Sequence, residues 1–193
     1  MQTETEKELA PVKVAIDKTA SRFAVQAFAT GMLSAFGHNP TIAIRDYDCE
    51  IQFNPDSVDN ACVHMTVRTN AMEVVDEMKS DDRKKLEEAM YNQVLEVSRF
   101  STATFESKQI TIQKQNSNQW QARVNGELAF HGVTQNLSFD ARVMYMGTMM
   151  RVAGEFPQRQ SDYGIKPVSF AGGALRLKDE LKFSFELVVR QQE

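Results

Sequence analysis

One stretch decides the fold class of this chain: Gly126-Glu-Leu-Ala-Phe-His-Gly-Val-Thr-Gln-Asn-Leu-Ser-Phe-Asp-Ala-Arg-Val143. Apolar and polar side chains alternate on both sides of a short polar segment, Thr134 to Asn136. Because successive side chains of a strand point to opposite faces, each half carries its large apolar groups on one face. Thr, Gln and Asn supply turn chemistry between the halves. The stretch therefore predicts a β-hairpin with its turn at 134–136.

The same alternation recurs along most of the chain and predicts an all-β fold with one or two helices. About eight or nine antiparallel strands would leave exposed edges in an open sheet, and closure into a barrel removes them. We therefore expect a single antiparallel β-barrel of about eight strands, whose interior holds packed side chains or one small elongated ligand. The further strands are expected at 21–30, 41–53, 61–69, 102–107, 109–114, 119–130, 137–145 and 148–156, with the last ones between 175 and 189.

Two segments depart from the strand pattern. Leu86, Ala89, Met90 and Val94 recur at spacings of three and four residues, which predicts an amphipathic helix over 81–97 that covers or plugs the sheet. The connection 31–40 is apolar, and an apolar loop has little reason to stay exposed. We expect this connection to fold over one barrel end and to place Phe36 and His38 near a ligand entrance.

Length and composition exclude several classes of protein. A chain of 193 residues is one domain, with residues 1–11 expected as a flexible tail and 12–193 as the barrel. The net charge of -4 argues against a nucleic-acid surface. No run approaches the ~20 apolar residues that span a bilayer. The acidic N-terminus lacks the features of a signal peptide, so a cytoplasmic location is expected, or a periplasmic one if a leader has been lost.

The two cysteines are expected to be reduced structural thiols. If strands 41–53 and 61–69 pair across the turn near 54–60, residue 49 lies opposite residue 65. Cys62 then points to the other face from Cys49, which disfavours a disulfide. Two cysteines without a repeated CxxC pattern are also weak evidence for a metal site.

The chain carries no recognisable catalytic signature, and we predict that it is not an enzyme. A nucleophile elbow, a P-loop and a dinucleotide glycine pattern are all missing from the sequence. The three histidines, His38, His64 and His131, do not form a metal-ligand pattern, so no metal and no cofactor are predicted. His38 or His131 could hydrogen-bond a ligand headgroup at a barrel mouth, but bonding to loop backbone is the better interpretation of both.

The predicted ligand-binding residues are those on one face of the strands, together with a few residues at a mouth. Apart from Phe36 and His38, the mouth candidates are Asp162 and Tyr163, which could form a polar lid contact or simply a turn. Which face of the strands is inward stays open at this point. The candidates for the cavity wall are Phe23, Val25, Ala27, Ile51, Phe53, Val63, Met65, Phe105, Leu137, Phe139, Phe183 and Phe185.

Several segments together resemble the YceI family. They are 100–107 (Phe-Ser-Thr-Ala-Thr-Phe-Glu-Ser), the hairpin 126–143, 161–165 (Ser-Asp-Tyr-Gly-Ile) and 177–181 (Leu-Lys-Asp-Glu-Leu), and the resemblance runs from about 21 to 189. Gly37-His38-Asn39-Pro40 resembles a variant branch of that family. The resemblance implies a lipocalin-like barrel that binds an isoprenoid-type lipid, such as a polyprenyl chain or quinone tail, and it makes a homodimer plausible.

The leading hypothesis is therefore a barrel that binds an elongated apolar ligand for storage or transport. Its expected partner is a hydrophobic small molecule or lipid, without nucleic acid or integral membrane association. One alternative is an enzyme that acts on a small hydrophobic substrate and uses His38. Another is a stress-related or scaffold barrel whose interior is filled.

Overall fold

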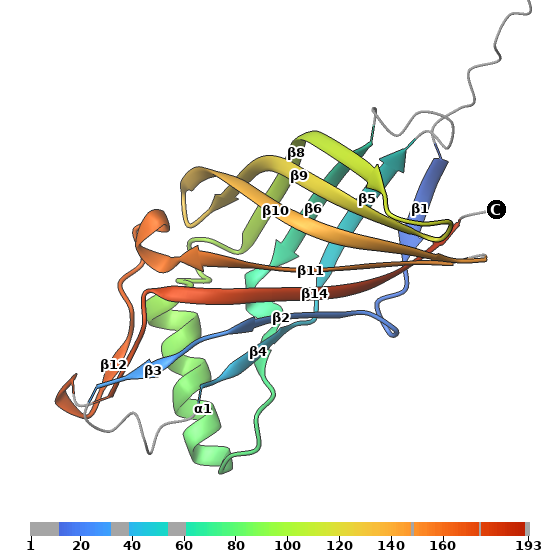
Figure 1. Ribbon diagram of the computed structural model, residues 1–193. Helices are drawn as coiled ribbons and strands as arrows, with labels where there is room; N and C mark the ends of the chain where they lie inside the picture. Colours follow the sequence, from blue (N-terminus) through green and yellow to red (C-terminus); the bar gives the residue numbers. More distant parts are fainter. Residues whose placement is uncertain (1–11, 32–38, 54–60, 148, 174, 192–193) are drawn as a thin grey trace, which may run out of the picture.

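The chain forms a closed β-barrel, described by a computed structural model for residues 12–31, 39–53, 61–147, 149–173 and 175–191 (Figure 1). Each strand of the ring is antiparallel to its neighbours, and β14 pairs with β1 to close the ring. The predicted single barrel of about eight strands is confirmed. In order around the ring, the strands are β1 (Val12–Ile16), β5 (Tyr47–Phe53), β6 (Cys62–Arg68), β8 (Thr102–Lys114), β9 (Gln119–Phe130), β10 (Val133–Met146), β11 (Met149–Arg159) and β14 (Glu180–Gln191).

The sheet divides at β14, because two different strands pair with different parts of the same edge of β14. Residues 189–191 of β14 pair with β1, whereas residues 182–186 pair with β2. From β2 the sheet continues through β4 to β7, again antiparallel. The three added strands are β2 (Arg22–Gln26), β4 (Thr41–Ile44) and β7 (Met72–Val74).

One helix covers the end of the barrel to which β2, β4 and β7 belong (Figure 1). Helix α1 spans Ser80–Ala89 and continues as a wider π-helical turn, Met90–Val94. Asp81 and Asp82 lie in its first turn, where the helix dipole favours negative charge. The predicted covering helix is therefore present, but it begins at 80 and its last turn is π-helical.

Shorter elements lie at the same end. A second sheet has the order β12-β13-β3, built from β3 (Ala29–Thr30), β12 (Ser169–Phe170) and β13 (Leu175–Leu177). Single 3₁₀ turns occur at Thr69–Ala71, Gln160–Tyr163 and Ala171–Gly173.

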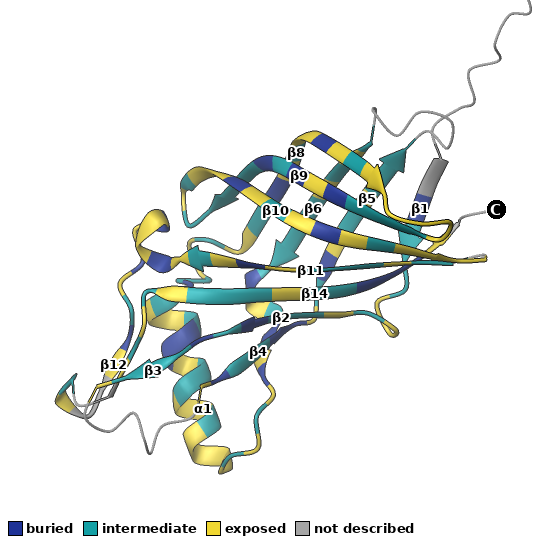
Figure 2. Cartoon of the chain, viewed as in Figure 1, coloured by how far each residue is buried: buried dark blue, intermediate teal, exposed yellow. Residues whose placement is uncertain are grey.

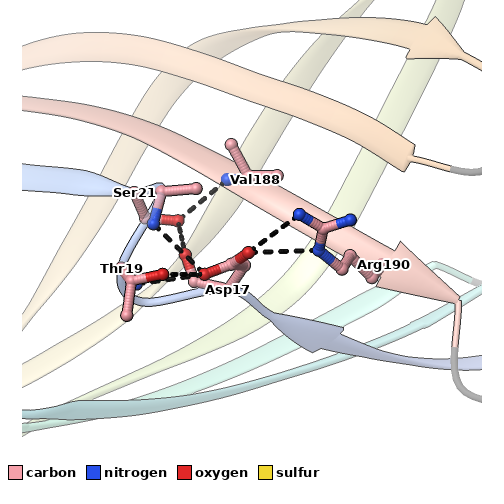
Figure 3. Close-up of polar contacts among 6 residues, drawn as sticks. Asp17, Thr19, Ser21, Val188 and Arg190 are labelled. Carbon is pink, nitrogen blue, oxygen red and sulfur yellow. Dashed lines mark hydrogen bonds and ion pairs between the residues drawn. The ribbon is translucent and has the colours of Figure 1, made fainter.

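Strands β1 and β2 are separated by a turn at Asp17–Ser21 that is held to β14 (Figure 3). The backbone N–H of Asp17 donates to the carbonyl of Val188, and the N–H of Val188 donates to Oγ of Ser21. The Asp17 carboxylate accepts from the N–H groups of Thr19 and Ala20 and from the Thr19 hydroxyl. The backbone N–H and carbonyl of Val188 are therefore both hydrogen-bonded at the point where β14 changes its pairing partner. A buried backbone needs such partners for its polar groups.

Buried and exposed residues alternate along the barrel strands, as the period of two predicts (Figure 2). On β10, Leu137 and Ala141 are buried, while Ser138 and Asp140 are exposed. The buried residues form two clusters, one around the α1 end and one further along the barrel. A cavity runs through both clusters, as described below.

The predicted turn of the β9–β10 hairpin is wrong. The chain reverses at His131 and Gly132, whose φ angles are 52° and 77°. Two consecutive positive φ angles are what a two-residue type I′ turn needs, and its twist matches that of the strands. Residues 134–136 instead lie within β10 and pair with residues 127–129 of β9.

Two predicted strands are also interrupted. The segment 41–53 is broken at Arg45 and Asp46, so that β4 pairs with β2 and β7 whereas β5 pairs with β1 and β6. The break changes the inward parity, because Ile42 and Ile44 face the cavity before it and Cys49 faces the cavity after it. The segment 21–30 is likewise divided into β2 and β3, which belong to different sheets.

Elsewhere, two segments that were predicted as separate strands form one continuous strand. The two strands predicted at 102–107 and 109–114 are one strand, β8, with a bulge between Ser107 and Gln109. Residues 158–173, which follow the strand predicted at 148–156, include the end of β11, two 3₁₀ turns and β12. A bulge adds one residue and shifts the local alternation, which makes one strand read as two.

Candidate functional site

The barrel encloses a cavity of about 250 Å³. Its wall includes Leu181, Phe183, Phe185 and Leu187, which together extend over roughly 20 Å of β14 at the usual rise per residue. A volume of this size spread over such a length is narrow and elongated. Nearly all of the wall is aliphatic or aromatic, so the cavity suits an apolar ligand.

Most of the predicted wall residues do line this cavity, but two of the described site residues, Phe53 and Asp162, do not. Phe53 ends β5 outside the wall, and Asp162 is exposed on the turn 160–163, whose Gln160 and Tyr163 are buried. Phe36 and His38 fall outside the described residues. Ligand binding by the wall residues stays a prediction. Those that line the cavity are Phe23, Val25, Ala27, Ile51, Val63, Met65, Phe105, Leu137, Phe139, Tyr163, Phe183 and Phe185.

An aromatic cluster crosses the middle of the cavity. The ring centroid of Phe139 lies 5.7 Å from that of Phe105, 5.1 Å from that of Phe156 and 5.6 Å from that of Phe185. Phe156 in turn stacks on Phe183 at 5.1 Å with nearly parallel planes. Offset and edge contacts at these distances are favourable. The cluster offers flat apolar surfaces to whatever occupies the barrel.

The sequence alone missed the part of the wall that comes from α1, β4 and β7. The apolar face of the helix was visible in its periodicity, but the sequence did not show which barrel end it would cover. Strand β7 is too short to show an alternation. These missed wall residues are Ile42, Ile44, Met72, Val74, Leu86, Ala89, Met90 and Val94.

Polar wall groups gather at the α1 end, where β11 leads into the turn 160–163. Nε2 of Gln158 donates to the Tyr163 hydroxyl at 2.7 Å, and Nε2 of Gln160 donates to the carbonyl of Lys178 at 2.9 Å. Burial raises the pKa of Tyr163, so its hydroxyl stays protonated at neutral pH. Arg159 also borders the cavity and is exposed. This end can therefore meet the polar part of a ligand.

His131 is not a wall residue, and the structure gives it a structural role. Its Nδ1 lies 3.1 Å from the carbonyl of Tyr163, and its Nε2 lies 2.9 Å from a carboxylate oxygen of Glu96. Its ring also packs on Phe100. The hydrogen bond from Arg99, with a smaller effect of His131, lowers the pKa of the Glu96 carboxyl. The hairpin turn is thereby tied to the 160–163 turn and to the segment after α1.

The two cysteines lie on opposite faces of the β5–β6 pair, as expected. Cys49 pairs with Met65 and lines the cavity, whereas Cys62 pairs with Gln52 and is exposed. Both thiols are free. Burial raises the pKa of Cys49 to about 12, although the side chain is partly accessible. We attribute that accessibility to the cavity, because Cys49 borders it.

Within the ranges that the structure describes, no three or more His, Cys, Asp and Glu side chains are grouped closely enough to hold a metal ion. The titratable residues of the described wall are Cys49, Arg159 and Tyr163. No helix in the described part of the chain is both long enough and apolar enough to cross a membrane.

Comparison with known proteins gives one family and several solved structures. Residues 14–189 match the YceI-like domain. Burkholderia cenocepacia BcnA is 16% identical, with a TM-score of 0.68 over 90% of this chain and 98% of that one. A polyisoprenoid binding domain from Saccharophagus degradans is 14% identical, with a TM-score of 0.65 over 95% and 100%. Campylobacter jejuni YCEI protein is 14% identical, with a TM-score of 0.59 over 79% and 85%.

At such identities, the likeness to the solved structures concerns the fold alone. No curated protein sequence matches the chain.

Proposed function

The chain belongs to the YceI-like family, and on this premise we propose that its barrel binds one elongated apolar molecule for storage or transport. The ligand that we favour is an isoprenoid-type lipid or a quinone with an isoprenoid tail. The observation that carries the proposal is the narrow apolar cavity of about 250 Å³ that runs along β14.

The shape and chemistry of the wall support a hydrocarbon chain in the barrel. Each 100 Å² of apolar ligand surface that leaves water contributes about 2.5 kcal/mol. A polar group in the aromatic middle of the cavity would lose its hydrogen bonds to water and find few replacements. Tyr163 and Arg159, at the α1 end, are the groups that we expect to face the polar head. The name of the Saccharophagus degradans domain, a polyisoprenoid binding domain, agrees with this class of ligand.

We further propose that the protein binds its ligand without chemical turnover. General acid-base catalysis needs a group that titrates near the working pH within hydrogen-bond reach of the substrate. Burial raises the pKa of both Cys49 and Tyr163, so each side chain is protonated at neutral pH. Among the described residues, the titratable groups of the cavity wall are therefore better suited to orienting a ligand and recognising its shape than to transferring protons.

Solvent extraction tests the proposal. The protein is purified without detergent and extracted with chloroform and methanol, and the extract is analysed by mass spectrometry. A blank from the same column provides the control. We expect one class of isoprenoid-type lipid, in an amount that approaches one molecule per chain, and delipidated protein should take up a long-chain polyprenol.

An extract without lipid, together with delipidated protein that takes up no polyprenol and no apolar dye, would refute the binding function. Such a result would favour a barrel whose interior serves only the fold.

A further inference from the structure

The turn between β10 and β11 has an unusual surface. Met144, Tyr145 and Met146 are 38%, 44% and 40% exposed, although each is a large hydrophobic residue. β10 and β11 stay paired up to this turn, with Tyr145 opposite Met150 and Met146 opposite Met149. The hairpin tip therefore gathers four methionines and a tyrosine where a turn is ordinarily polar.

A neighbouring turn at the same barrel end provides an internal comparison. β8 and β9 are joined by residues 115–118, Gln-Asn-Ser-Asn, which are polar and exposed. The two turns touch, since the N–H of Tyr145 donates to the carbonyl of Asn118 at 2.9 Å. Both lie at the end of the barrel away from α1 (Figure 1). Because one turn is fully polar and the other apolar, the fold at this end does not itself require exposed hydrophobic side chains.

The strand segments around the tip also differ in charge from the rest of the chain. The segments 112–124, 141–147, 149–154 and 187–190 contain no Asp and no Glu, although the whole chain has a net charge of -4. The charged residues within these four segments are therefore all basic. The basic residues of these segments are Lys114, Arg123, Arg142, Arg151 and Arg190.

Part of this positive charge is compensated by acidic residues further along the strands. Arg123 lies 3.0 Å from Asp140, and Arg151 lies 2.8 Å from Glu186. Arg190 is likewise paired with Asp17. Among the residues that the structure describes, Lys114 and Arg142 have no such carboxylate partner and are both exposed. These two exposed cations lie on strands near the apolar tip.

We propose that this hairpin tip docks the protein on an anionic lipid surface, with Met144, Tyr145 and Met146 in the interface and the basic side chains over the headgroups. Apolar and aromatic side chains together with nearby Lys and Arg are the combination that binds membrane interfaces. Methionine adapts to an irregular apolar environment, and tyrosine favours the boundary between headgroups and tails. A projecting tip suits a fluid surface better than a rigid protein groove. The inference goes beyond ligand binding, because docking does not use the cavity.

Vesicle flotation tests the docking surface. Purified protein is floated with vesicles of phosphatidylcholine alone and with vesicles that contain equal parts of phosphatidylcholine and phosphatidylglycerol. We expect binding to the anionic vesicles, which weakens as salt is added. Replacing both Met144 and Met146 with Ser should weaken that binding roughly tenfold, since apolar surface no longer enters the interface.

Two charge variants provide the matched comparison. Arg142→Gln should weaken binding to anionic vesicles, whereas Lys84→Gln, the same change of charge on the exposed side of α1, should leave it unchanged. Circular dichroism and uptake of an apolar dye check that each variant is folded and that its barrel is intact. Absence of vesicle binding, equal binding to both vesicle types, or binding that survives the double methionine substitution would overturn the proposal. None of these results depends on an extracted lipid. The experiments can therefore refute the docking proposal and the ligand-binding proposal independently of each other.

Discussion

Arg190 donates two hydrogen bonds to the same carboxylate oxygen of Asp17, from Nε at 3.1 Å and from Nη2 at 3.0 Å (Figure 3). The contact joins the turn between the first two strands to the last strand of the barrel. It lies beside Val188, where β14 passes from pairing with β1 toward pairing with β2. The ion pair therefore holds the point at which the sheet divides.

The first prediction concerns the pH dependence of this junction. The hydrogen bond from the Thr19 hydroxyl, followed by that from Arg190, lowers the pKa of Asp17 from 3.8 to about 2. A carboxylate whose pKa is lower in the folded state stabilises the fold above its unfolded value and loses that effect as the pH falls through the folded value. In denaturant titrations, wild type should be more stable than Asp17→Asn above pH 3.8, and the difference should shrink toward pH 2.

A Thr19→Val variant tests the assigned cause. Because it removes the largest contribution to the lowered pKa, the pH dependence should be weaker than in wild type. A difference between wild type and Asp17→Asn that stays constant from neutral pH to pH 2 would contradict the assignment.

The second prediction concerns occupancy of the cavity. Ala141 is 3% exposed and lines the cavity, so Ala141→Leu should fill part of the narrow space and lower the affinity for a polyprenol by about tenfold or more. Ala153→Leu makes the same change in a shallow depression on the outer face and should leave the affinity unchanged. Dye displacement in the delipidated proteins measures both. Equal affinities for the two variants would show that the ligand lies elsewhere.

The third prediction uses the two thiols to report the faces of the β5–β6 pair. Cys62 is exposed and should react with iodoacetamide in the native protein at neutral pH. Cys49, whose pKa burial raises to about 12, should react only after unfolding in guanidinium. Peptide mass spectrometry would locate the modified cysteine. Native labelling of Cys49 at the rate of Cys62 would contradict the inward orientation of Cys49.

The fourth prediction concerns a close approach between neighbouring strands. A Cβ at Gly154 would lie 2.6 Å from the carbonyl oxygen of Asp140 and 2.6 Å from the Phe185 ring. Because backbone cannot move as freely as a side chain tip, Gly154→Ala should lower the free energy of unfolding by about 1–3 kcal/mol. Urea denaturation measures the change.

Gly147→Ala serves as the comparison, since a Cβ there meets nothing within 4 Å and has to accept only a φ of 70°. That conformation alone costs about 1 kcal/mol. A smaller loss of stability for Gly154→Ala than for Gly147→Ala would contradict the close approach.

Local pattern was enough to predict the fold class and which residues of a strand share one face. The period of two is a property of the strand backbone, so the alternation of β6 and β10 identified which of their residues share a face. The predicted bounds of β9, 119–130, agree with the structure. Val63 and Met65 share one face of β6, Leu137 and Phe139 share one face of β10, and the structure turns both faces toward the cavity.

Tertiary structure alone decided which partners each half of a broken strand takes. Arg45 and Asp46 are adjacent charged residues that interrupt the alternation, but the sequence does not show that β4 and β5 on either side of them pair with different strands. The β9–β10 turn lies at His131 and Gly132 and not at the predicted 134–136. Two consecutive positive φ angles form a tight two-residue turn, so the strands stay paired up to it. The α1 face, β4 and β7 entered the cavity wall for a related reason: pairing between segments far apart in sequence determines which apolar faces meet, and no periodicity within one segment contains that information.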